Sequence, residues 1–449
     1  MTQAVVANKT ETKTDMKLLE LTQSVCPVCL DVIDARIVVN NNAVFMEKAC
    51  PQHGAYSTYL WPDEEHYRWL KNFKFPYIRP NALKPVRNGC PEDCGPCQSH
   101  LNRPRLVELE LTQRCNLRCP ICFMAADDNQ ANLTTDLKLS VIERQLINIM
   151  NQCGPQTSIQ LTGGEPTIRE DLPDIISLCR EIGFSAIEVN TNGVVISRDI
   201  NYLERLAASG ATGIYMQFDG LDNEVFKTIR GANLLGTKLR AIDNCRSMGM
   251  PVVLAMAIIR GVNDRQMGKV LQFGLENRDV IAGVAYQPAF GSGRFEITDK
   301  KPLTMGDAIY ELSEQSNGLL TPYDFWPTGC SHPLCDATTY VLPQPQGLVP
   351  MSKIISVQDY LHHFNPASPQ GSVLPDIADK MYPGHEPGLS ILIMNYMDAM
   401  SMDLKRLRQC SMTVAGEEGT QIPFCSYQLT NIDGLKRSEL AGKSIPGSR

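Results

Sequence analysis

From residue 106 onward, short apolar segments alternate with longer segments whose apolar residues recur every three or four positions. The first pattern predicts buried strands and the second predicts amphipathic helices. The predicted strands are 107–112, 158–162, 186–190, 213–218, 252–259 and 282–287. The predicted helices are 138–151, 172–182, 201–208, 235–248 and 265–276. Six strands separated by five helices predict an α/β fold, whose parallel sheet can curl into a full or partial barrel.

The flanking regions lack this alternation. Residues 1–18 are polar and predict a disordered tail without the apolar core of a secretory signal. Residues 19–104 contain six cysteines and several prolines, which predicts a small domain held together by bound metal. Residues 301–449 contain scattered prolines and the last four cysteines and predict an irregular C-terminal domain, in which 389–407 looks helical. The barrel domain would then span 105–300.

The composition is that of a globular protein, since 43% of the 449 residues are hydrophobic and 20% are charged. The net charge of −7 provides no overall basic field, so we expect no nucleic-acid partner. The longest strongly apolar run, 389–397, is much shorter than the roughly 20 residues of a membrane-spanning helix. We therefore expect a cytoplasmic protein without a transmembrane segment, and peripheral contact with a membrane stays open.

Cysteine is the unusual component, with 16 residues. In a reducing compartment such a number indicates metal sites or redox chemistry more than disulfides. Two triplets share the spacing Cys-x3-Cys-x2-Cys: Cys90, Cys94 and Cys97, and then Cys115, Cys119 and Cys122. The second triplet lies in the loop after the first predicted strand. Its three thiolates can hold three irons of a [4Fe–4S] cluster and leave the fourth iron open to a small molecule. A zinc knuckle or a fully ligated ferredoxin cluster is the alternative.

The loop after the second predicted strand reads Thr-Gly-Gly-Glu-Pro-Thr, residues 162–167. Gly163 and Gly164 would let the backbone approach a ligand closely, and Glu165 offers an acceptor for an ammonium group. Because the carboxyl ends of parallel strands share one edge of the sheet, we expect this turn to lie beside the second cysteine triplet.

Together, the cysteine loop and the Gly-Gly-Glu-Pro turn resemble the radical S-adenosylmethionine (radical SAM) superfamily. The resemblance implies that the open iron chelates the methionine moiety, that the Gly-Gly-Glu-Pro turn binds its amino group and that Phe123 lies near the adenine. It also implies a ribose site at later strand ends, for which we favour Asn192 and Gln217 over Asn190 and Asp219. A reductant such as flavodoxin or ferredoxin would reduce the cluster. The resulting 5′-deoxyadenosyl radical would abstract hydrogen from carbon.

The other cysteines form three groups. The first comprises Cys26, Cys29, Cys50 and His53, in the pattern Cys-x2-Cys followed by Cys-x2-His. This donor set suits Zn²⁺ or a rubredoxin-like mononuclear iron, and the alternative is a redox Cys-x2-Cys pair unrelated to His53.

The remaining two groups predict two auxiliary [4Fe–4S] clusters in addition to the catalytic one. No second Gly-Gly-Glu-Pro turn accompanies Cys90, Cys94 and Cys97, and His100 is a candidate fourth ligand. The last group comprises Cys330, Cys335, Cys410 and Cys425. A zinc site, or His332 in place of one thiolate, is the alternative there.

The order of these motifs resembles the tetraether lipid synthase family, over roughly residues 22–430. The shared elements include Cys-Pro-x-His-Gly, Gly-Cys-Pro-x-Asp-Cys-Gly-x-Cys and Cys-Ser-His-Pro-Leu-Cys. One departure is the lack of a cysteine between Cys97 and Cys115, which leaves the ligation of the first auxiliary cluster open.

The resemblance implies hydrogen abstraction from carbon, and we expect C–C bond formation on a lipid-like substrate. The alternative is a radical methyltransferase or other modifier of a pterin or peptide, which would need a compact polar pocket instead of a long apolar channel. A non-enzymatic iron–sulfur electron carrier is disfavoured, because it would not need to orient S-adenosylmethionine.

Overall fold

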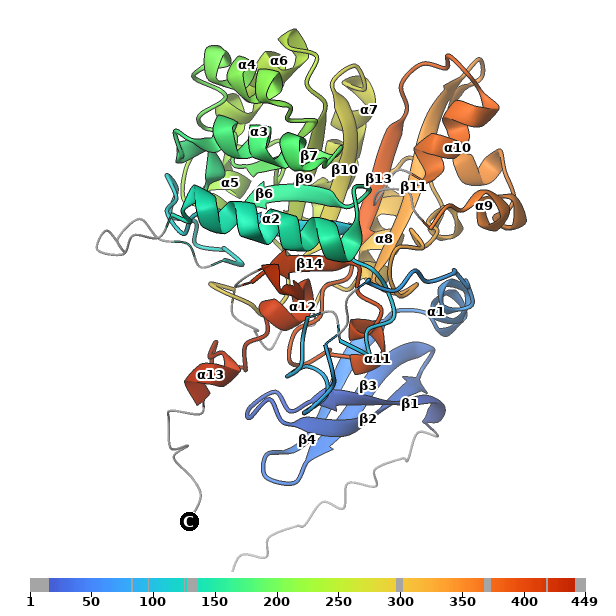
Figure 1. Cartoon of the computed structure of the whole chain (residues 1–449). Helices are drawn as coiled ribbons and strands as arrows, with labels where there is room; N and C mark the ends of the chain where they lie inside the picture. The colour runs from blue at the N-terminus through green and yellow to red at the C-terminus, as the bar shows by residue number, and fades with distance from the viewer. Residues whose placement is uncertain are drawn as a thin grey trace, which may run out of the picture.

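The computed structural model describes residues 16–81, 84–95, 97–124, 126, 136–295, 302–366, 373–416 and 419–440. At its centre is a sheet with helices packed along its outer side (Figure 1). Six consecutive neighbours in this sheet are parallel. They are β5 (Leu106–Glu110), β6 (Ser158–Thr162), β7 (Ile187–Thr191), β8 (Gly213–Gln217), β9 (Val252–Ile258) and β10 (Ile281–Pro288). The predicted α/β fold with a partial six-stranded barrel is confirmed.

The helices between these strands also follow the predicted pattern. They are α2 (Leu139–Cys153), α3 (Leu172–Ile182), α4 (Ile200–Ser209), α6 (Leu235–Ser247) and α7 (Met267–Glu276). In α2, Ile142, Leu146 and Ile149 are buried, and their spacing of three or four places them on one face of the helix. Packing of that apolar face supplies most of the driving force for such a helix.

One barrel helix, α5 (Asn223–Arg230), was not predicted. The Asp222 carboxylate accepts a hydrogen bond from the Glu224 N–H at the start of this helix. Gly231, with a φ of 76°, ends it in the left-handed region. An aspartate before the helix and a glycine after it are readable signals, so the sequence contained the information.

The C-terminal region extends both edges of the barrel sheet. Beside β10 lies β13 (Leu389–Met394), which is parallel to it, followed by the antiparallel strands β11 (Asp336–Gln344) and β12 (Gly347–Pro350). Beside β5 lies β14 (Met412–Ala415), also parallel, followed by the antiparallel β15 (Gln421–Pro423). These C-terminal strands belong to the same sheet as the barrel strands. The domain boundary expected at residue 300 stays a prediction.

The helix expected over 389–407 is wrong. Its first part is β13, and its last part is the short helix α11 (Leu404–Leu407). In β13, the alternate residues Leu389, Ile391 and Ile393 are fully buried. A short apolar run does not distinguish a strand from a buried helix by its own pattern. Here pairing with β10 and β11 on either side decides for the strand.

The N-terminal part is a separate antiparallel sheet of β1 (Lys17–Val25), β2 (Val32–Asn40), β3 (Ala43–Cys50) and β4 (Gly54–Trp61). Residues 1–15 of the predicted tail lie outside the described residues, and Lys17 already belongs to β1. Figure 1 shows this sheet below the barrel, against the segment that contains α11. The contact includes Lys48 Nζ, which donates to the Ala399 carbonyl at 2.7 Å.

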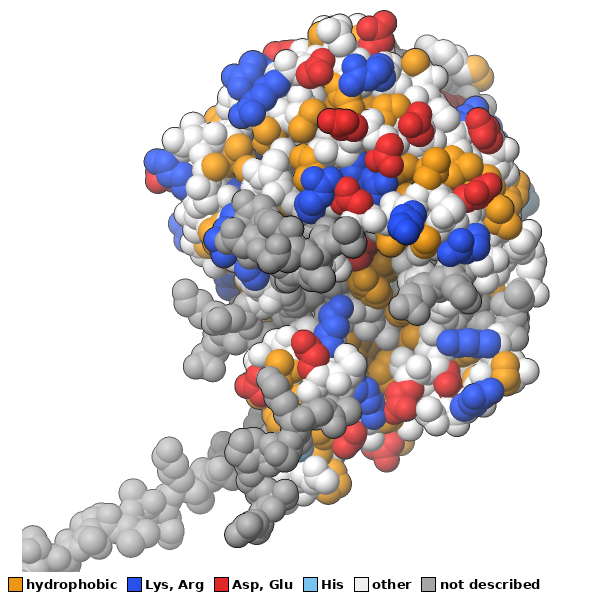
Figure 2. Space-filling view, turned by 60° about the vertical axis from the view of Figure 1, so that its left-hand side comes forward, with side chains coloured by type: hydrophobic (Ala, Val, Ile, Leu, Met, Phe, Trp, Pro, Cys, Tyr) orange, Lys and Arg blue, Asp and Glu red, His pale blue; other side chains and the backbone are white. Residues whose placement is uncertain are grey.

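The remaining helices pack around these two sheets. They are α1 (Glu64–Lys71), α8 (Met305–Gln315), α9 (Val357–His363), α10 (Val373–Met381), α12 (Phe424–Tyr427) and α13 (Arg437–Leu440). In the part of the chain that is described, no helix combines the length and apolarity needed to cross a bilayer. Side chains of both charges are interspersed on the face shown in Figure 2.

Candidate active site

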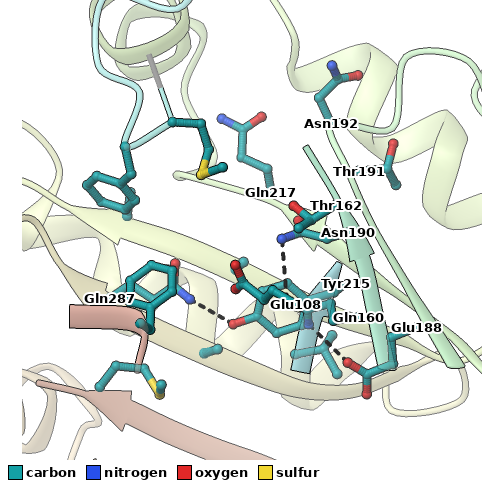
Figure 3. Close-up of a pocket in the computed structure, with 18 of the residues that line it drawn as sticks. Glu108, Gln160, Thr162, Glu188, Asn190, Thr191, Asn192, Tyr215, Gln217 and Gln287 are labelled. Atoms are coloured by element: carbon teal, nitrogen blue, oxygen red, sulfur yellow. Dashed lines mark hydrogen bonds between the residues drawn. The ribbon is translucent and has the colours of Figure 1, made fainter. Parts of the chain in front are cut away.

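A cavity of about 350 Å³ lies inside the barrel and extends to the loops that follow the strands. The three cysteines of the second triplet, Cys115, Cys119 and Cys122, line its loop end. Polar side chains from the strands line its interior, as Figure 3 shows. This is the end of a parallel α/β sheet at which ligands generally bind.

Segments that follow other barrel strands hold the cysteine loop in place. The Arg294 backbone N–H donates to the Cys122 carbonyl at 2.9 Å, and its guanidinium donates to the Cys119 carbonyl at 3.0 Å. From the end of α5, the Arg230 guanidinium donates to the Ile121 carbonyl at 3.1 Å. The loop therefore depends on contacts with chain more than 100 residues away.

Gly163 and Gly164 lie against the cysteine loop itself. A Cβ atom on Gly163 would stand 2.3 Å from the Thr112 carbonyl oxygen, and one on Gly164 would stand 2.1 Å from that of Arg114. The Gly164 N–H also donates to the Thr112 carbonyl at 2.7 Å. The close approach expected of these glycines is thus to the backbone that leads into Cys115, and it brings the two motifs together.

Glu165 is 1% exposed, and its carboxylate is held by the chain around it. Its Oε1 accepts from the Thr167 backbone and hydroxyl and from the Thr191 hydroxyl. Its Oε2 accepts from the Asn192 backbone N–H at 2.7 Å. Burial raises the pKa of this carboxyl, and the hydrogen bonds act in the opposite direction. Oε2, with one partner, keeps acceptor capacity for a cationic group in the cavity.

The thiols of Cys115, Cys119 and Cys122 lie near the Glu165 carboxyl, and all four groups are negatively charged when ionised. Burial raises the pKa of Cys115 to about 12, and Glu165, Cys119 and Cys122 add to the rise. Bound metal ions favour thiolates, and an ammonium group would compensate a buried carboxylate. The donor set therefore fits an iron–sulfur cluster together with the amino group of S-adenosylmethionine.

Near the cysteine loop, Gln217 belongs to a buried hydrogen-bond network with Lys238, Asp219 and Arg230. Its amide accepts from Lys238 Nζ at 3.0 Å and donates to Asp219 at 2.8 Å. Asp219, one of the less favoured ribose candidates, pairs with the guanidinium of Arg230 at 2.7 Å. Burial lowers the pKa of Lys238 to about 7. Gln217 thus lines the cavity, and its hydrogen bonds with Lys238 and Asp219 fix the orientation of its amide. Asp219 instead positions Arg230 near Cys119.

The two asparagines after β7 point to different places. Asn190 and Asn192 both line the cavity. The Asn192 amide donates to Asn116 in the cysteine loop at 2.7 Å. The Asn190 amide instead lies 3.5 Å from Gln160, deeper in the barrel. Asn192 therefore lies beside the cysteine loop, and its role at a ribose stays a prediction.

The interior of the cavity has a polar floor that the sequence analysis missed. It comprises Glu108, Gln160, Glu188, Tyr215 and Gln287 from five different strands (Figure 3). Gln160 donates to Glu188 at 3.1 Å, and Gln287 donates to the Tyr215 hydroxyl at 2.8 Å. Glutamate within otherwise apolar strands such as Leu-Val-Glu-Leu-Glu was the available signal, because both faces of such strands are usually buried.

Aromatic side chains form another wall of the same cavity. The ring of Phe123 lies 4.9 Å from that of Phe290, which lies 5.1 Å from that of Tyr396. Tyr396 in turn lies 4.7 Å from Phe424. Phe123, Tyr396 and Phe424 line the cavity and offer ring faces to a flat ligand.

A second site lies in the N-terminal sheet. The potential ligand atoms of Cys26, Cys29, Cys50 and His53 all lie within 4.8 Å of one another. His53 Nδ1 is 3.6 Å from Cys26 Sγ and 3.4 Å from Cys50 Sγ. Cys26 and Cys29 lie in the turn after β1, whereas Cys50 ends β3 and His53 lies in the turn that follows it. The structure thus brings the four predicted ligands together in an arrangement that fits a tetrahedral metal.

The first triplet, Cys90, Cys94 and Cys97, is absent from the cavity lining. Cys90 and Cys94 pack against an apolar cluster built mainly from the C-terminal region. Burial raises the pKa of Cys94 to about 12, and its two partners in the triplet add to the rise. The His100 ring, proposed as a fourth ligand, lies 2.8 Å from the Cys410 carbonyl oxygen.

The C-terminal cysteines are brought together in part. Cys410 and Cys425 belong to the same apolar cluster, and burial together with the thiols of Cys425 and Cys335 raises the pKa of Cys410. The Cys330 sulfur instead accepts a hydrogen bond from the Arg105 guanidinium at 3.3 Å. Among the described residues, only the N-terminal site has its ligand atoms gathered within 4.8 Å of one another, so joint ligation by the four C-terminal cysteines stays a prediction.

Two protein-family models match the segments that contain the second cysteine triplet and the N-terminal site. The family model described as the radical SAM superfamily matches residues 109–274. A second model, described as the HMPTM N-terminal zinc ribbon domain, matches residues 18–62.

Two curated relatives and one solved structure illustrate the similarity. The 7,8-dihydro-6-hydroxymethylpterin dimethyltransferase of Methanocaldococcus jannaschii is 32% identical over 494 residues, covering 95% of this chain and 96% of the relative. The GTP 3′,8-cyclase of Staphylococcus carnosus is 34% identical over 179 residues, covering 38% of this chain and 52% of the relative. Streptococcus suis SuiB bound to precursor peptide SuiA is 20% identical, covering 49% of this chain and 46% of that one with a TM-score of 0.40.

Proposed function

This chain is a radical SAM enzyme of the same family as its archaeal relative, and on that basis we propose that it methylates a pterin. The change would replace a carbon-bound hydrogen of the pterin with a methyl group. The relative that matches nearly the full chain is named for this activity. Its name favours the pterin alternative over the lipid coupling that we expected from the motifs.

The observation that carries the proposal is the polar floor of the cavity. Glu108, Gln160 and Glu188 line the interior among apolar residues such as Val253 and Leu392, so they interrupt the continuous apolar wall that an alkyl chain would require. Burying an unpaired carboxylate against hydrocarbon is costly, whereas the nitrogen-rich edge of a pterin offers it hydrogen bonds. A volume of about 350 Å³ also lies within the usual range for small-molecule pockets.

We assign the cofactor residues as follows. Cys115, Cys119 and Cys122 hold the catalytic cluster, and Gly163, Gly164 and Glu165 form the turn that receives the amino group of S-adenosylmethionine. Phe123, Asn192 and Gln217 surround the nucleoside. When bound, the cluster and S-adenosylmethionine supply a carbon-centred radical that removes hydrogen from the substrate.

The chain's own residues position these groups and exclude water. The glycine turn keeps Glu165 next to the cysteine loop, and Arg294 and Arg230 hold that loop over the cavity. The aromatic side chains of Phe123, Tyr396 and Phe424 line one side of the cavity. Such enclosure protects a reactive radical from side reactions.

The other sites would support this reaction. We propose that Cys26, Cys29, Cys50 and His53 bind a structural Zn²⁺, in keeping with the zinc ribbon model that matches this segment. We also propose auxiliary [4Fe–4S] clusters at the first triplet and at the C-terminal cysteines. A small reductant of the flavodoxin or ferredoxin type would supply electrons to the protein.

The test is anaerobic incubation of reconstituted protein with S-adenosylmethionine, dithionite, 7,8-dihydro-6-hydroxymethylpterin and a deproteinised cell extract as a source of one-carbon donors. We expect mass spectrometry to detect a pterin whose mass has risen by one or two methyl groups. A parallel incubation with lipid extract provides the comparison. Formation of coupled lipids with an unchanged pterin would overturn the proposal.

A further inference from the structure

Glu108 is a buried carboxylate that faces the cavity without a protein partner. It exposes 6% of its surface and lines the cavity from β5. Two other glutamates nearby have a partner: Glu188 accepts from Gln160 at 3.1 Å, and Glu110 Oε2 accepts from Tyr427 at 2.8 Å, although Glu110 Oε1 has none among the described residues. Among the described residues, none forms a hydrogen bond with the Glu108 carboxylate. A buried polar group with no partner usually signals a missing ligand or water.

The groups around Glu108 do not supply a counter-charge. Burial raises the pKa of its carboxyl to about 8, and the charge of Glu110 adds to the rise. The other titratable groups that interact with it are the phenols of Tyr215, Tyr396 and Tyr427. The site thus offers an acceptor that a ligand with hydrogen-bond donors could satisfy.

We propose that Glu108 binds the substrate edge that carries two adjacent N–H donors, such as the aminopyrimidinone half of a pterin. This inference rests on the proposed function and names the contact that would select the substrate. A carboxylate has two oxygens that can accept two parallel N–H groups. The 2-amino group and the ring N3–H of a pterin present such a pair on one side.

The remaining walls fit the rest of such a ring. Phe123, Tyr396 and Phe424 can contact its flat face. The amides of Gln160 on β6 and Gln287 on β10 also line the cavity and can contact its other polar atoms. A ring held by its pyrimidine edge at Glu108 would direct its opposite half, where carbon is substituted, away from the floor.

The test compares two ligands on two proteins. The ligands are 7,8-dihydro-6-hydroxymethylpterin and the corresponding lumazine, in which an oxo group replaces the 2-amino group. Binding to anaerobic, cofactor-loaded protein is measured by fluorescence titration. The unaltered protein should prefer the pterin. Glu108→Gln should weaken pterin binding by about 10- to 100-fold, the effect of losing a charge-assisted pair, and should largely abolish the preference.

Glu110→Gln is the matched control. It lies two residues away on the same strand, but its carboxylate pairs with Tyr427 and is not part of the cavity lining. We expect it to retain the preference for the pterin. Iron content and reductive cleavage of S-adenosylmethionine should be unchanged in Glu108→Gln, which separates loss of recognition from loss of structure. If that variant does not fold, Glu108→Asp retains the charge and should keep the preference with weaker binding.

The outcomes separate this inference from the proposed function. Retention of the pterin preference by Glu108→Gln, or equal binding of the two ligands by the unaltered protein, would overturn the role of Glu108. In either case, methylation of the pterin by the unaltered protein would leave the function standing. A protein that cleaves S-adenosylmethionine but neither binds nor methylates the pterin would overturn the function and the inference together.

Discussion

The two cysteine triplets have the same spacing but different surroundings. Cys115, Cys119 and Cys122 line the barrel cavity beside Glu165. The triplet at 90–97 is not in that lining and packs against C-terminal residues. Spacing determines what a loop can ligate, whereas the neighbouring elements determine what else can reach the metal. Among the described residues, the Gly-Gly-Glu-Pro turn lies against the backbone that leads into the second triplet, and that triplet lines the barrel cavity.

The largest expected effect tests that difference directly. Replacing Cys115, Cys119 and Cys122 with alanine should abolish reductive formation of 5′-deoxyadenosine, because the cluster that reduces S-adenosylmethionine would be lost. The product is measured by liquid chromatography. The matched variant, with alanine at Cys90, Cys94 and Cys97, should still form it. Equal activity in both triple variants would remove the distinction between the triplets.

In contrast to this activity, the metal content should fall equally in the two triple variants. If both triplets and the C-terminal cysteines hold [4Fe–4S] clusters, reconstituted protein should contain about 12 irons and 12 sulfides, and each triple variant should lose about four of each. The Cys26→Ala, Cys29→Ala variant should lose one metal ion, no sulfide and much of the folding stability of residues 19–75. Metal and sulfide analysis checks this. A total of only four irons would refute the auxiliary clusters.

Glu165→Ala tests whether the turn contributes to binding. Loss of a charge-assisted hydrogen bond of roughly 1.5–3 kcal/mol should weaken S-adenosylmethionine binding by about 10- to 100-fold. Equilibrium dialysis of the cluster-loaded protein measures the dissociation constant. Glu170→Ala, at an exposed position five residues away, is the control and should leave it unchanged. An unaltered constant in Glu165→Ala would exclude this residue from the site.

The last expected effect is a pH dependence confined to the cavity, which is at most about tenfold for each pH unit. Because burial raises the pKa of Glu108 to about 8, the carboxyl is mostly protonated below that pH in the ligand-free protein. N–H donors bind the ionised form, so pterin binding should release a proton. The association constant should therefore rise by up to about tenfold per pH unit between pH 6 and 8 and level off above. The same slope in Glu108→Gln would contradict this.

Much of the barrel was predictable because its signals are local. The strand 158–162 and the helix 172–182 were predicted with the boundaries that the structure has. The metal-binding groups were visible as spacings. The role of the two glycines was not, because it depends on the backbone of residues 112–114 lying against them.

The features that the sequence analysis did not predict depend on contacts between residues far apart in the sequence. Glu108 and Glu188 could be recognised as unusual, but only closure of the sheet shows that they face one cavity. The strand β13 was mistaken for helix because its partners, β10 and β11, lie outside its own sequence. Cys330 could be grouped with Cys335 by proximity in sequence, whereas the fold turns its sulfur toward Arg105.

The pairing of β14 with β5 has a consequence for biosynthesis. Val107 on β5 pairs with Thr413 on β14, so this edge of the barrel stays uncovered until β14, more than 300 residues later in the chain, has left the ribosome. Translation proceeds at about 5–20 residues per second, which leaves the edge unpaired for tens of seconds. Unpaired strand edges promote aggregation. We therefore expect the nascent chain to need protection by chaperones until β14 has been synthesised and has paired with β5.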